Sequence, residues 1–272
     1  MNTRAIRATM VLRMDSAKRI ISIAWRIRGW LVSCALVVIG SCCVAFLVSL
    51  VLMKQDPGWW ARLTLDEAGT IERAGLLHNA FATRLHELKE TDTVVDDDWR
   101  SVEDRFFIKA DDANAWLNIE MPRWLANMDE DVHWPAVFRE LQVSFENDEI
   151  RVGIRLLAGR REQVVWLTLT PVLREDGSLW LPAKRIHVGR MPLPVSWVLS
   201  EAELRADSYI PAEFRDLPET AAMFRVFAGQ QPVAEEATVR LMDGRRVRLL
   251  SLVPRGGRLE VAVRQERELA TR

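Results

Sequence analysis

The longest run of apolar positions lies near the N-terminus, where residues 29–53 contain no charged side chain. A helix rises about 1.5 Å per residue, so about twenty apolar residues cross a hydrocarbon layer of ~30 Å. The run therefore predicts one membrane-spanning helix. It divides the chain into a tail at residues 1–28, the span at 29–53, a juxtamembrane linker at 54–63 and a folded domain at 64–272.

The hydrophobic pattern of the folded domain predicts an α+β fold. Apolar residues recur at helical spacing between residues 65 and 89, after a Thr64-Leu65-Asp66-Glu67 segment that has the form of a capping box. A short strand at 106–108 and a helix capped by Asp111 or Asp112, which ends before Pro122, follow. Helices are also predicted at 195–204 and 218–227.

Long strands with period-two alternation occupy most of the remaining domain. Asn147-Asp148 and Asp176-Gly177 are typical of hairpin turns, and three C-terminal strands are separated by Asp243-Gly244 and Gly256-Gly257. Hairpins without crossover helices favour an antiparallel arrangement. We therefore expect a long-stranded, curved antiparallel sheet packed on helices.

Charge indicates which way the span points. Residues 1–28 carry seven Arg or Lys and one Asp, a net charge of +6; with Lys54 set apart, the chain total of −1 leaves −8 on residues 55–272. Basic residues beside a span favour the cytoplasmic side. We expect a single-pass protein of the cell (inner) membrane, with its tail cytoplasmic and its domain in the periplasm or an equivalent extracytoplasmic space.

Three tryptophans and the tail fit this placement. Trp30 near one end of the span, and Trp59 with Trp60 beyond the other, are typical of the aromatic belts at headgroup depth. The tail has a basic amphipathic pattern, which favours either a helix lying on the inner leaflet or a disordered tail that only sets topology. Met10 or Met14 is an alternative start.

A cleaved lipoprotein signal is the alternative to an uncleaved anchor. Residues 39–42, which end at Cys42, resemble a lipoprotein cleavage site after an apolar core of ordinary length. However, the eleven residues from 43 to 53 stay apolar, where a lipidated cysteine is normally followed by a polar linker. The continued apolar run favours the uncleaved anchor.

The candidate chemistry of the domain is sparse. All three cysteines lie in the span, which excludes thiol catalysis and cysteine-ligated zinc from the domain. The histidines, at positions 78, 86, 133 and 187, show no chelating pair, and there is no Gly-x-Ser-x-Gly elbow or P-loop. We therefore expect no metal, no cofactor and no enzymatic activity. An acidic domain outside the cell also makes nucleic acid an improbable partner.

One predicted strand, at residues 164–173, has apolar side chains on both faces. The face with Val164, Trp166 and Val172 lies opposite the one with residues 165, 167, 169 and 173. A sheet covered on one side only should show polar residues on its other face, so something apolar covers this one. The cover is either a second layer of the protein or the ligand of a hydrophobic groove.

The segment from Asp176-Gly177-Ser178-Leu179 to Pro192-Leu193-Pro194 resembles the end of the YpmS-like family of membrane-anchored extracytoplasmic proteins. The helix with Asn114, Trp116 and Leu117 is similar too, so the resemblance covers about residues 106–199. That family is uncharacterised, and the resemblance implies a curved sheet wrapped on helices in the manner of lipid-binding tubular domains. It implies no catalytic residue.

These patterns predict a membrane-anchored, non-enzymatic protein of the cell envelope that binds lipid or another hydrophobic ligand in the groove at Val164, Trp166 and Val172. The alternative is a structural or scaffold subunit whose domain binds an envelope protein, and a less favoured one is an extracytoplasmic hydrolase.

Overall fold

A computed structural model describes residues 34, 36–87, 91–95, 98–128, 137–158, 161–204, 218–241 and 244–268. The chain forms two compact units, Met1–Leu52 and Met53–Arg272. Trp30, His133 and the tail at 1–28 lie outside the described residues. The boundary places residues 54–63, predicted as a linker, inside the second unit.

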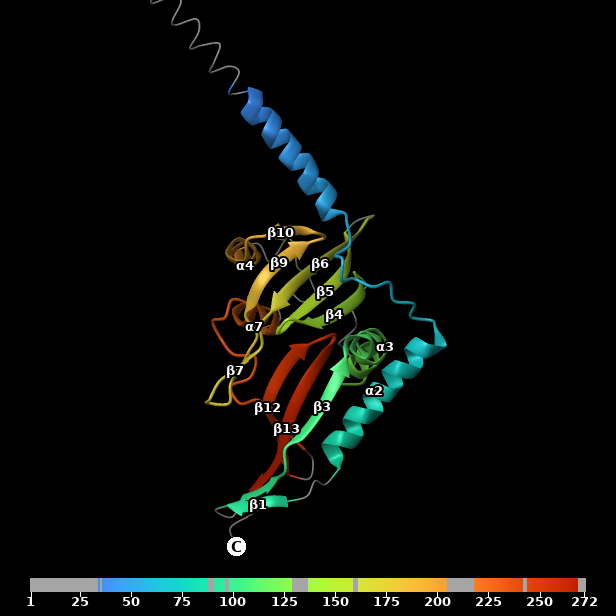
Figure 1. Cartoon of the computed structure of the whole chain (residues 1–272), viewed down its shortest axis with the longest axis vertical. Coiled ribbons are helices and arrows are strands. Elements are labelled where there is room, and N and C mark those ends of the chain that lie inside the picture. Colours follow the sequence, from blue (N-terminus) through green and yellow to red (C-terminus); the bar gives the residue numbers. More distant parts are fainter. Residues whose placement is uncertain are drawn as a thin grey trace, which may run out of the picture. The chain divides into compact units, whose positions relative to one another are not determined.

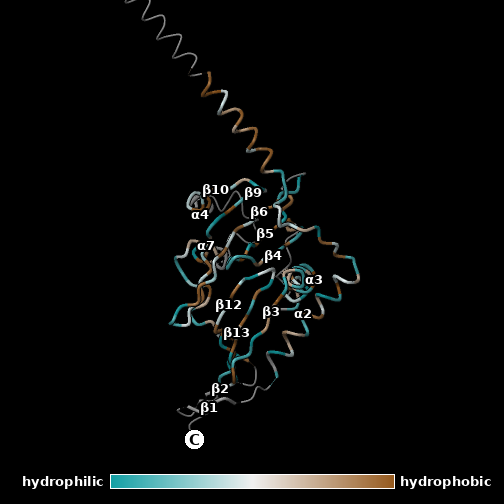
Figure 2. The backbone as a smooth tube through the Cα atoms, viewed as in Figure 1, coloured by the Kyte–Doolittle hydropathy of each residue, from teal (hydrophilic) through white to brown (hydrophobic). Residues whose placement is uncertain are grey.

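The described part of the first unit is helical. Leu36–Met53, 18 residues long, is the only helix among the described residues that is long and apolar enough to cross a membrane. Figure 2 shows this helix as a hydrophobic stretch, in contrast to the mixed strands of the second unit. Ser49 Oγ donates to the Ala45 carbonyl (2.8 Å), which satisfies its hydroxyl within the helix. The helix is thus suited by length and composition to be a membrane anchor or a signal sequence.

The second unit is α+β with antiparallel sheets, as predicted (Figure 1). Its strands form two larger sheets and one two-stranded ribbon, where the sequence predicted one curved sheet. The first sheet has the order β10-β9-β6-β5-β4, with β10 Met191–Leu193, β9 Ala183–Val188, β6 Arg161–Leu169, β5 Glu149–Ala158 and β4 Phe138–Glu146. We call it the upper sheet, after its position in Figure 1.

The lower sheet has the order β1-β2-β13-β12-β11, and β3 also pairs with β13. Its strands are β1 Thr91–Val95, β2 Asp98–Ser101, β3 Asp104–Lys109, β11 Thr238–Arg240, β12 Arg246–Arg255 and β13 Arg258–Glu268. The predicted C-terminal meander is confirmed by β11–β12–β13. Strands β1 and β2 pair antiparallel with each other.

The two sheets are joined through their hairpin turns. Asn147 and Asp148 have φ of 53° and 60°, as a tight primed turn requires, and Gly257 has φ of 77°. The Asp148 amide donates to the Pro254 carbonyl (3.0 Å), and the Gly257 amide donates to the Phe145 carbonyl (2.8 Å). These two bonds fix the β4–β5 turn against the β12–β13 turn.

Helices cover the sheets and close the core. The helices are α2 Ala68–His86, α3 Ala110–Met128, α4 Val195–Leu204 and α7 Pro218–Phe227. The bounds of α4 and α7 confirm the prediction. The core is centred on Ala113, Phe145, Ile150 and Leu169, with residues of α7, β12 and β13 packed against them. It therefore lies between α3, the upper sheet and the ends of the lower sheet.

Two predicted helix boundaries are wrong. Helix α2 begins at Ala68 and not at residue 65. Its N-cap is Glu67, which makes no side-chain capping bond. Helix α3 continues through Pro122 to Met128. Proline forfeits one intrahelical hydrogen bond, and packing of α3 on α2 and β4 evidently outweighs that loss.

Two asparagines on α3 complete the outer edge of β4. Asn114 accepts from the Val143 amide (2.6 Å) and donates to its carbonyl (3.2 Å), and Asn118 does the same at Leu141 (2.8 and 2.6 Å). They are four residues apart on the helix and bond to alternate residues of the strand, so the two side-chain amides act as a substitute neighbouring strand. This arrangement satisfies backbone N–H and C=O groups of an edge strand that would otherwise be open to pairing with another strand.

We expect Asn114→Leu to lower the free energy of unfolding by about 2–4 kcal/mol, because it leaves the Val143 amide and carbonyl without partners and each such group costs about 1–3 kcal/mol. Asn79→Leu, on the exposed side of α2, is the matched control and should change stability by less than about 0.5 kcal/mol. Urea unfolding of the full chain in detergent measures both. Equal losses of stability in the two variants would contradict the role of Asn114 as a hydrogen-bonding partner of the β4 edge.

Candidate functional site: the juxtamembrane strap

The outer face of the upper sheet is the side turned away from the core. Along β6, Leu167 and Leu169 contribute to the core, so Val164, Trp166 and Thr168 point to the outer face. The strand register places Gly153 beside Trp166 on one side and His187 on the other. The same face carries Gln142 and Arg155 on the neighbouring strands.

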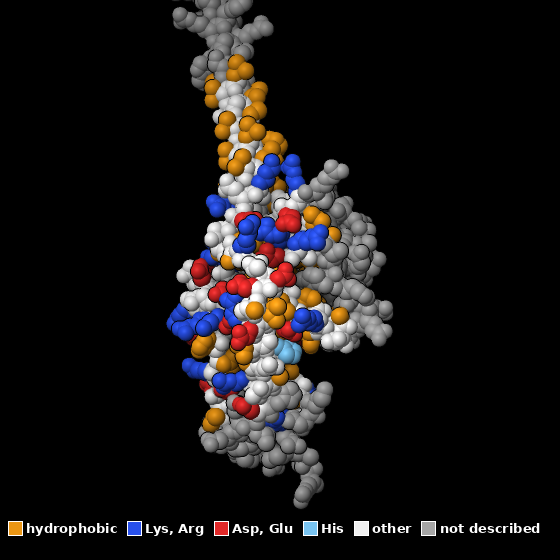
Figure 3. All heavy atoms as spheres, turned by 90° about the vertical axis from the view of Figure 1, so that its right-hand side faces the viewer, with side chains coloured by type: hydrophobic (Ala, Val, Ile, Leu, Met, Phe, Trp, Pro, Cys, Tyr) orange, Lys and Arg blue, Asp and Glu red, His pale blue; other side chains and the backbone are white. Residues whose placement is uncertain are grey.

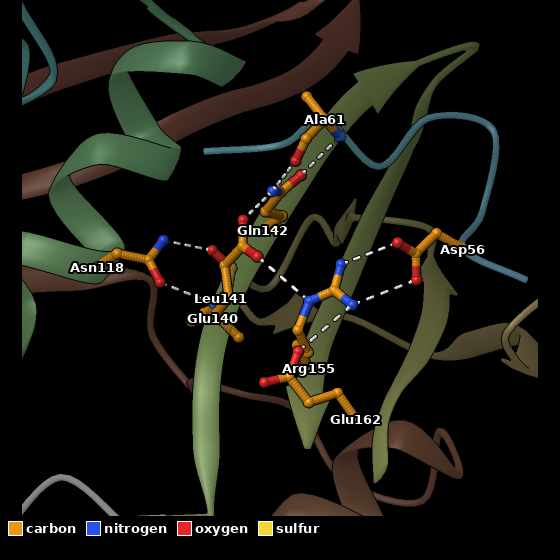
Figure 4. A network of polar contacts seen from close by, with 8 residues as sticks. All are labelled: Asp56, Ala61, Asn118, Glu140, Leu141, Gln142, Arg155 and Glu162. Carbon is orange, nitrogen blue, oxygen red and sulfur yellow. Dashed lines mark hydrogen bonds and ion pairs between the residues drawn. The ribbon is translucent and has the colours of Figure 1, made fainter. Parts of the chain in front are cut away.

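Residues 53–63, which we call the strap, cross this outer face. The Asp56 carboxylate accepts two bonds from the Arg155 guanidinium (3.0 and 3.3 Å), and its main-chain carbonyl accepts from Arg190 Nε (2.9 Å). Farther along, the Ala61 amide donates to Gln142 Oε1 (3.1 Å) and the Ala61 carbonyl accepts from Gln142 Nε2 (Figure 4). The strap is thus held to the sheet at both ends.

Between these ends, two tryptophans of the strap pack on the sheet. Trp59 lies edge-on to Trp166, with ring centroids 5.8 Å apart, and contacts Trp60 at 5.6 Å. Trp166 in turn stacks on His187, with centroids 3.8 Å apart and planes within 3°. Trp166 Nε1 donates to the Gly189 carbonyl (2.7 Å). The four rings form a continuous aromatic layer under and within the strap.

Gly153 provides the space for this layer. A Cβ atom at position 153 would lie 2.6 Å from the Trp60 ring, 3.0 Å from the Trp59 ring and 3.1 Å from Trp166 Cβ. The first distance is shorter than real Cβ contacts, and the other two are tighter than most, so the absence of a side chain at 153 permits the close approach of the strap.

Three polar atoms at the strap are buried without a hydrogen-bond partner among the described residues. They are the indole Nε1 atoms of Trp59 and Trp60 and Nδ1 of His187. Each unsatisfied group costs about 1–3 kcal/mol. Ring packing and the polar contacts at both ends of the strap therefore stabilise its docked state. The cost of the unsatisfied polar groups offsets part of that stabilisation.

Arg155 is the charged centre of the strap contact. Besides Asp56, its guanidinium lies 3.4 Å from a carboxylate oxygen of Glu140 and 4.0 Å from one of Glu162, and it sits 5.3 Å from the Trp60 ring centroid. Burial lowers the pKa of Arg155, but hydrogen bonding to Asp56 and the charges of Asp56 and Glu140 outweigh it and raise the pKa. One guanidinium thus joins the strap to β4 and β6.

A hollow of about 660 Å³ opens beside Arg155. It is lined by Asp56, Trp60, Arg62, Leu63, Thr64, Leu65, Arg139, Glu140, Arg155 and Glu162. The register of β4 with β5 is irregular between Phe138 and Glu140, and Arg139 lies at this irregularity. A β-bulge changes the direction in which a side chain points. The lining is mainly polar.

His187 is the titratable member of the aromatic layer. Burial lowers its pKa below the ordinary 6.5, and the nearby positive charge of Arg185 lowers it further. His187 is therefore neutral at pH 7 and stacks on Trp166 as an uncharged ring.

The structure separates the residues of the predicted groove. Val164 is 2 % exposed and Trp166 is covered by Trp59, whereas Val172 is 41 % exposed. The predicted continuous strand at 164–173 is wrong, because β6 ends at Leu169 and Val172 belongs to the ribbon of β7 Val172–Leu173 with β8 Leu179–Trp180. Trp59 of the chain itself covers Trp166, and Val172 lies in a separate ribbon; the ligand groove at these three residues stays a prediction.

Trp59 and Trp60, predicted for the membrane interface, lie on the sheet in the folded unit. Their position relative to headgroups stays a prediction, as does that of Trp30. Within the described residues, no group of three or more His, Cys, Asp or Glu side chains is placed to hold a metal ion.

The main residues of the strap contact were not singled out from the sequence. Asp56, Gln142, Gly153 and Arg155 carry no recognisable motif, and their contacts join segments about 80 to 100 positions apart. The one available signal was the strand at Trp166, which has apolar side chains on both faces. It indicated that something apolar covers the outer face, but not which segment does so.

Comparison of the chain with protein-family models, curated proteins and solved structures finds no match. The resemblance to the YpmS-like family therefore stays a prediction.

We expect Gly153→Ala to displace the strap from the sheet, because its new Cβ atom cannot fit beneath Trp60. Trypsin should then cleave the full chain after Lys54 and Arg62 at least about tenfold faster than in the wild type, since proteolysis follows the population of the open form. Gly75→Ala on α2, where a Cβ meets nothing within 4 Å, is the control and should leave these rates unchanged. Equal cleavage of all three proteins would contradict strap docking.

The low pKa of His187 makes stability depend on pH. Below pH 6.5 the unfolded state binds the proton more readily than the folded state, so stability is full above this pH and is lost as pH falls through the folded-state pKa. His187→Phe keeps a ring on Trp166 and should flatten the dependence between pH 7.5 and 5.5, by up to ~1.4 kcal/mol per pH unit. Thermal melting at a series of pH values measures this.

The control for this experiment is His78→Gln, which changes an exposed histidine on α2. It should leave the pH dependence as in the wild type. A His187→Phe protein with an undiminished slope would show that another group is responsible.

Proposed function

We propose that the chain is a single-span protein of the cell membrane, with its N-terminus cytoplasmic, whose second unit is a non-enzymatic extracytoplasmic scaffold that binds an envelope protein. The observation that carries the proposal is the strap. The folded unit begins at Met53, the last residue of the apolar helix, and Gln163 Nε2 donates to the Met53 carbonyl (3.3 Å). The residues that follow the apolar helix are thus part of the folded unit, and they cover the sheet face on which the sequence predicted a ligand groove.

The charge difference supports the orientation. The tail carries +6 and residues 55–272 carry −8, and a basic flank favours the cytoplasm.

The geometry supports a scaffold better than a carrier of apolar ligands. The strap occupies the outer sheet face on which the sequence predicted a groove, and the hollow beside it is lined by charged groups. On the part of the second unit shown in Figure 3, acidic and basic side chains are interleaved, and hydrophobic side chains form small separate groups.

A partner surface is available on the lower sheet. Phe107 on β3 is 54 % exposed, and the Arg258 guanidinium lies 5.3 Å from its ring centroid. An adjoining hollow of about 320 Å³ is lined by Arg105, Phe106, Phe107, Ser251, Val253, Glu260, Val261 and Ala262. Exposed aromatic and arginine side chains around a pocket are typical of the energetically dominant part of protein interfaces.

We expect a photo-reactive phenylalanine analogue at position 107 to cross-link one discrete envelope protein in intact cells. The same analogue at Leu76, which is 61 % exposed on α2, is the matched control and should give no discrete product. Arg258→Glu should remove most of the product at 107, because it replaces the cation that contacts the ring.

Two results would contradict the proposal. Identical products at positions 76 and 107 would show that contacts are nonspecific. Full protection of the second unit from protease added to intact spheroplasts would place it on the cytoplasmic side.

A further inference from the structure

We propose that the face of the lower sheet around Phe107 binds an extended segment of a protein in which two acidic side chains flank an apolar one at alternate positions. The inference rests on the proposed scaffold function and specifies the chemistry of the partner. The observation that carries it is a row of three cations, which lies next to the hollow at Phe107.

The surface concerned is the side of the lower sheet turned away from the core, which we call the open face. Leu252 and Leu259 pack against the core, so the residues that alternate with them on β12 and β13 point to the open face. The strand register divides this face into rows of side chains that lie opposite one another on β3, β13 and β12. Each row is two residues from the next, so successive rows are about 7 Å apart along the strands.

The first row holds three positive charges. Lys109 on β3, Arg258 on β13 and Arg255 on β12 lie opposite one another, and all three are exposed. Arg258 has one ion pair, with Glu260 at 3.9 Å, and among the described residues Lys109 and Arg255 form none. Like charges placed directly opposite in a sheet are destabilising. We call these three residues the cation row, and one carboxylate leaves it with an excess of two positive charges.

The next two rows form the hollow of about 320 Å³. They supply most of its lining, and they consist of Phe107, Glu260 and Val253, followed by Arg105, Ala262 and Ser251. The apolar side chains among them make the hollow a place for one large apolar side chain. Arg105 is paired with Glu103 (2.5 Å), but the pair is exposed and such pairs contribute little.

The rows beyond the hollow are also basic. Arg248 lies opposite Arg264, and Arg246 lies opposite Arg240. In total the five rows carry eight basic side chains against four carboxylates, two in the rows and two that pair with them from neighbouring loops. The open face is thus positive, although residues 55–272 carry a net charge of −8.

This arrangement favours an acidic protein segment over other anions. Arginine binds a carboxylate through two parallel charge-assisted hydrogen bonds, and complementary charge sets specificity at protein interfaces. Glu260 lies between the cation row and the far side of the hollow, where it repels a continuous surface or chain of phosphates. A protein segment avoids this repulsion by placing an apolar side chain there.

The spacing of the rows gives the order of residues in the segment. In an extended segment, side chains that point to the same side are also about 7 Å apart, at alternate positions. A segment that lies along the strands therefore places one acidic side chain at the cation row, an apolar one in the hollow and a second acidic one at Arg105.

The test uses the full chain in a non-ionic detergent, with the photo-reactive phenylalanine analogue at position 107 and a biotinylated peptide. In the peptide, two glutamates flank one leucine at alternate positions, and serines occupy the other positions. We expect it to cross-link at least about tenfold more than the same peptide with glutamines, because only the charged side chains complement the cation row. Equal cross-linking of the two peptides would overturn the proposal.

A third peptide tests the spacing. It has the same composition, but both glutamates are directly adjacent to the leucine, so that in an extended segment they point away from the side on which the leucine lies. We expect it to cross-link at least about threefold less than the alternating peptide. A yield equal to that of the alternating peptide would overturn the extended arrangement.

Variants then assign the binding to the cation row. Lys109→Gln with Arg255→Gln should reduce cross-linking of the glutamate peptide at least about fivefold, with a melting temperature unchanged or higher, because like charges have been removed. The control pair Arg161→Gln with Arg225→Gln removes two exposed arginines outside the lower sheet and should keep the wild-type yield. Equal loss in both pairs would overturn the assignment.

Cross-linking in intact cells separates this inference from the proposed function. The product at position 107 should be at least about fivefold less abundant in the Lys109→Gln, Arg255→Gln protein. A product as abundant as in the wild type would leave the scaffold in place and overturn the acidic segment. Absence of any discrete product in the wild type would contradict the scaffold and this inference together.

A short-chain lipid tests the membrane as the source of the anion. Soluble dihexanoylphosphatidylglycerol should displace the glutamate peptide no better than dihexanoylphosphatidylcholine does. Displacement by the phosphatidylglycerol alone would overturn the protein segment and assign the open face to an anionic membrane surface.

Discussion

The structure of the second unit depends on how both faces of the upper sheet are covered. Its inner face packs on α3 and the core around Phe145 and Ile150. Its outer face carries Trp166 and Val164, which are costly to expose to water. The residues that follow the apolar helix supply the second cover, because Trp59 and Trp60 lie over Gly153 and Trp166. The segment that follows the apolar helix is thus also a structural layer of the second unit.

Polar contacts determine where this layer lies. Ring packing alone would allow the strap to slide, whereas the bidentate Asp56–Arg155 pair and the paired bonds between Ala61 and Gln142 fix its register. Asp56 is half exposed, so its pair with Arg155 contributes less free energy than a buried pair would. The same guanidinium contacts Glu140 and Glu162 at the hollow, so the strap and the strands β4 and β6 share one charged residue.

Periodic segments and turns of the fold were predictable from the sequence. The alternation along β4, β5, β12 and β13, the turn at Asn147-Asp148 and the bounds of α4 and α7 follow from local patterns. The division into two sheets, and the passage of α3 through Pro122, depend on long-range packing that local spacing does not encode. The two-faced strand predicted a cover over Trp166, but a cover drawn from residues about 100 positions away has no sequence signature.

Hydrogen exchange of the wild-type strap, followed by mass spectrometry of peptides from residues 53–63 of the full chain, tests the central claim most directly. The Trp60 and Ala61 amides donate to the Pro57 carbonyl and to Gln142, so docking predicts that both exchange far more slowly than an unstructured segment. Gln142→Ala should remove the protection at Ala61. Exchange of the wild-type strap at the rate of an unstructured peptide would contradict the account.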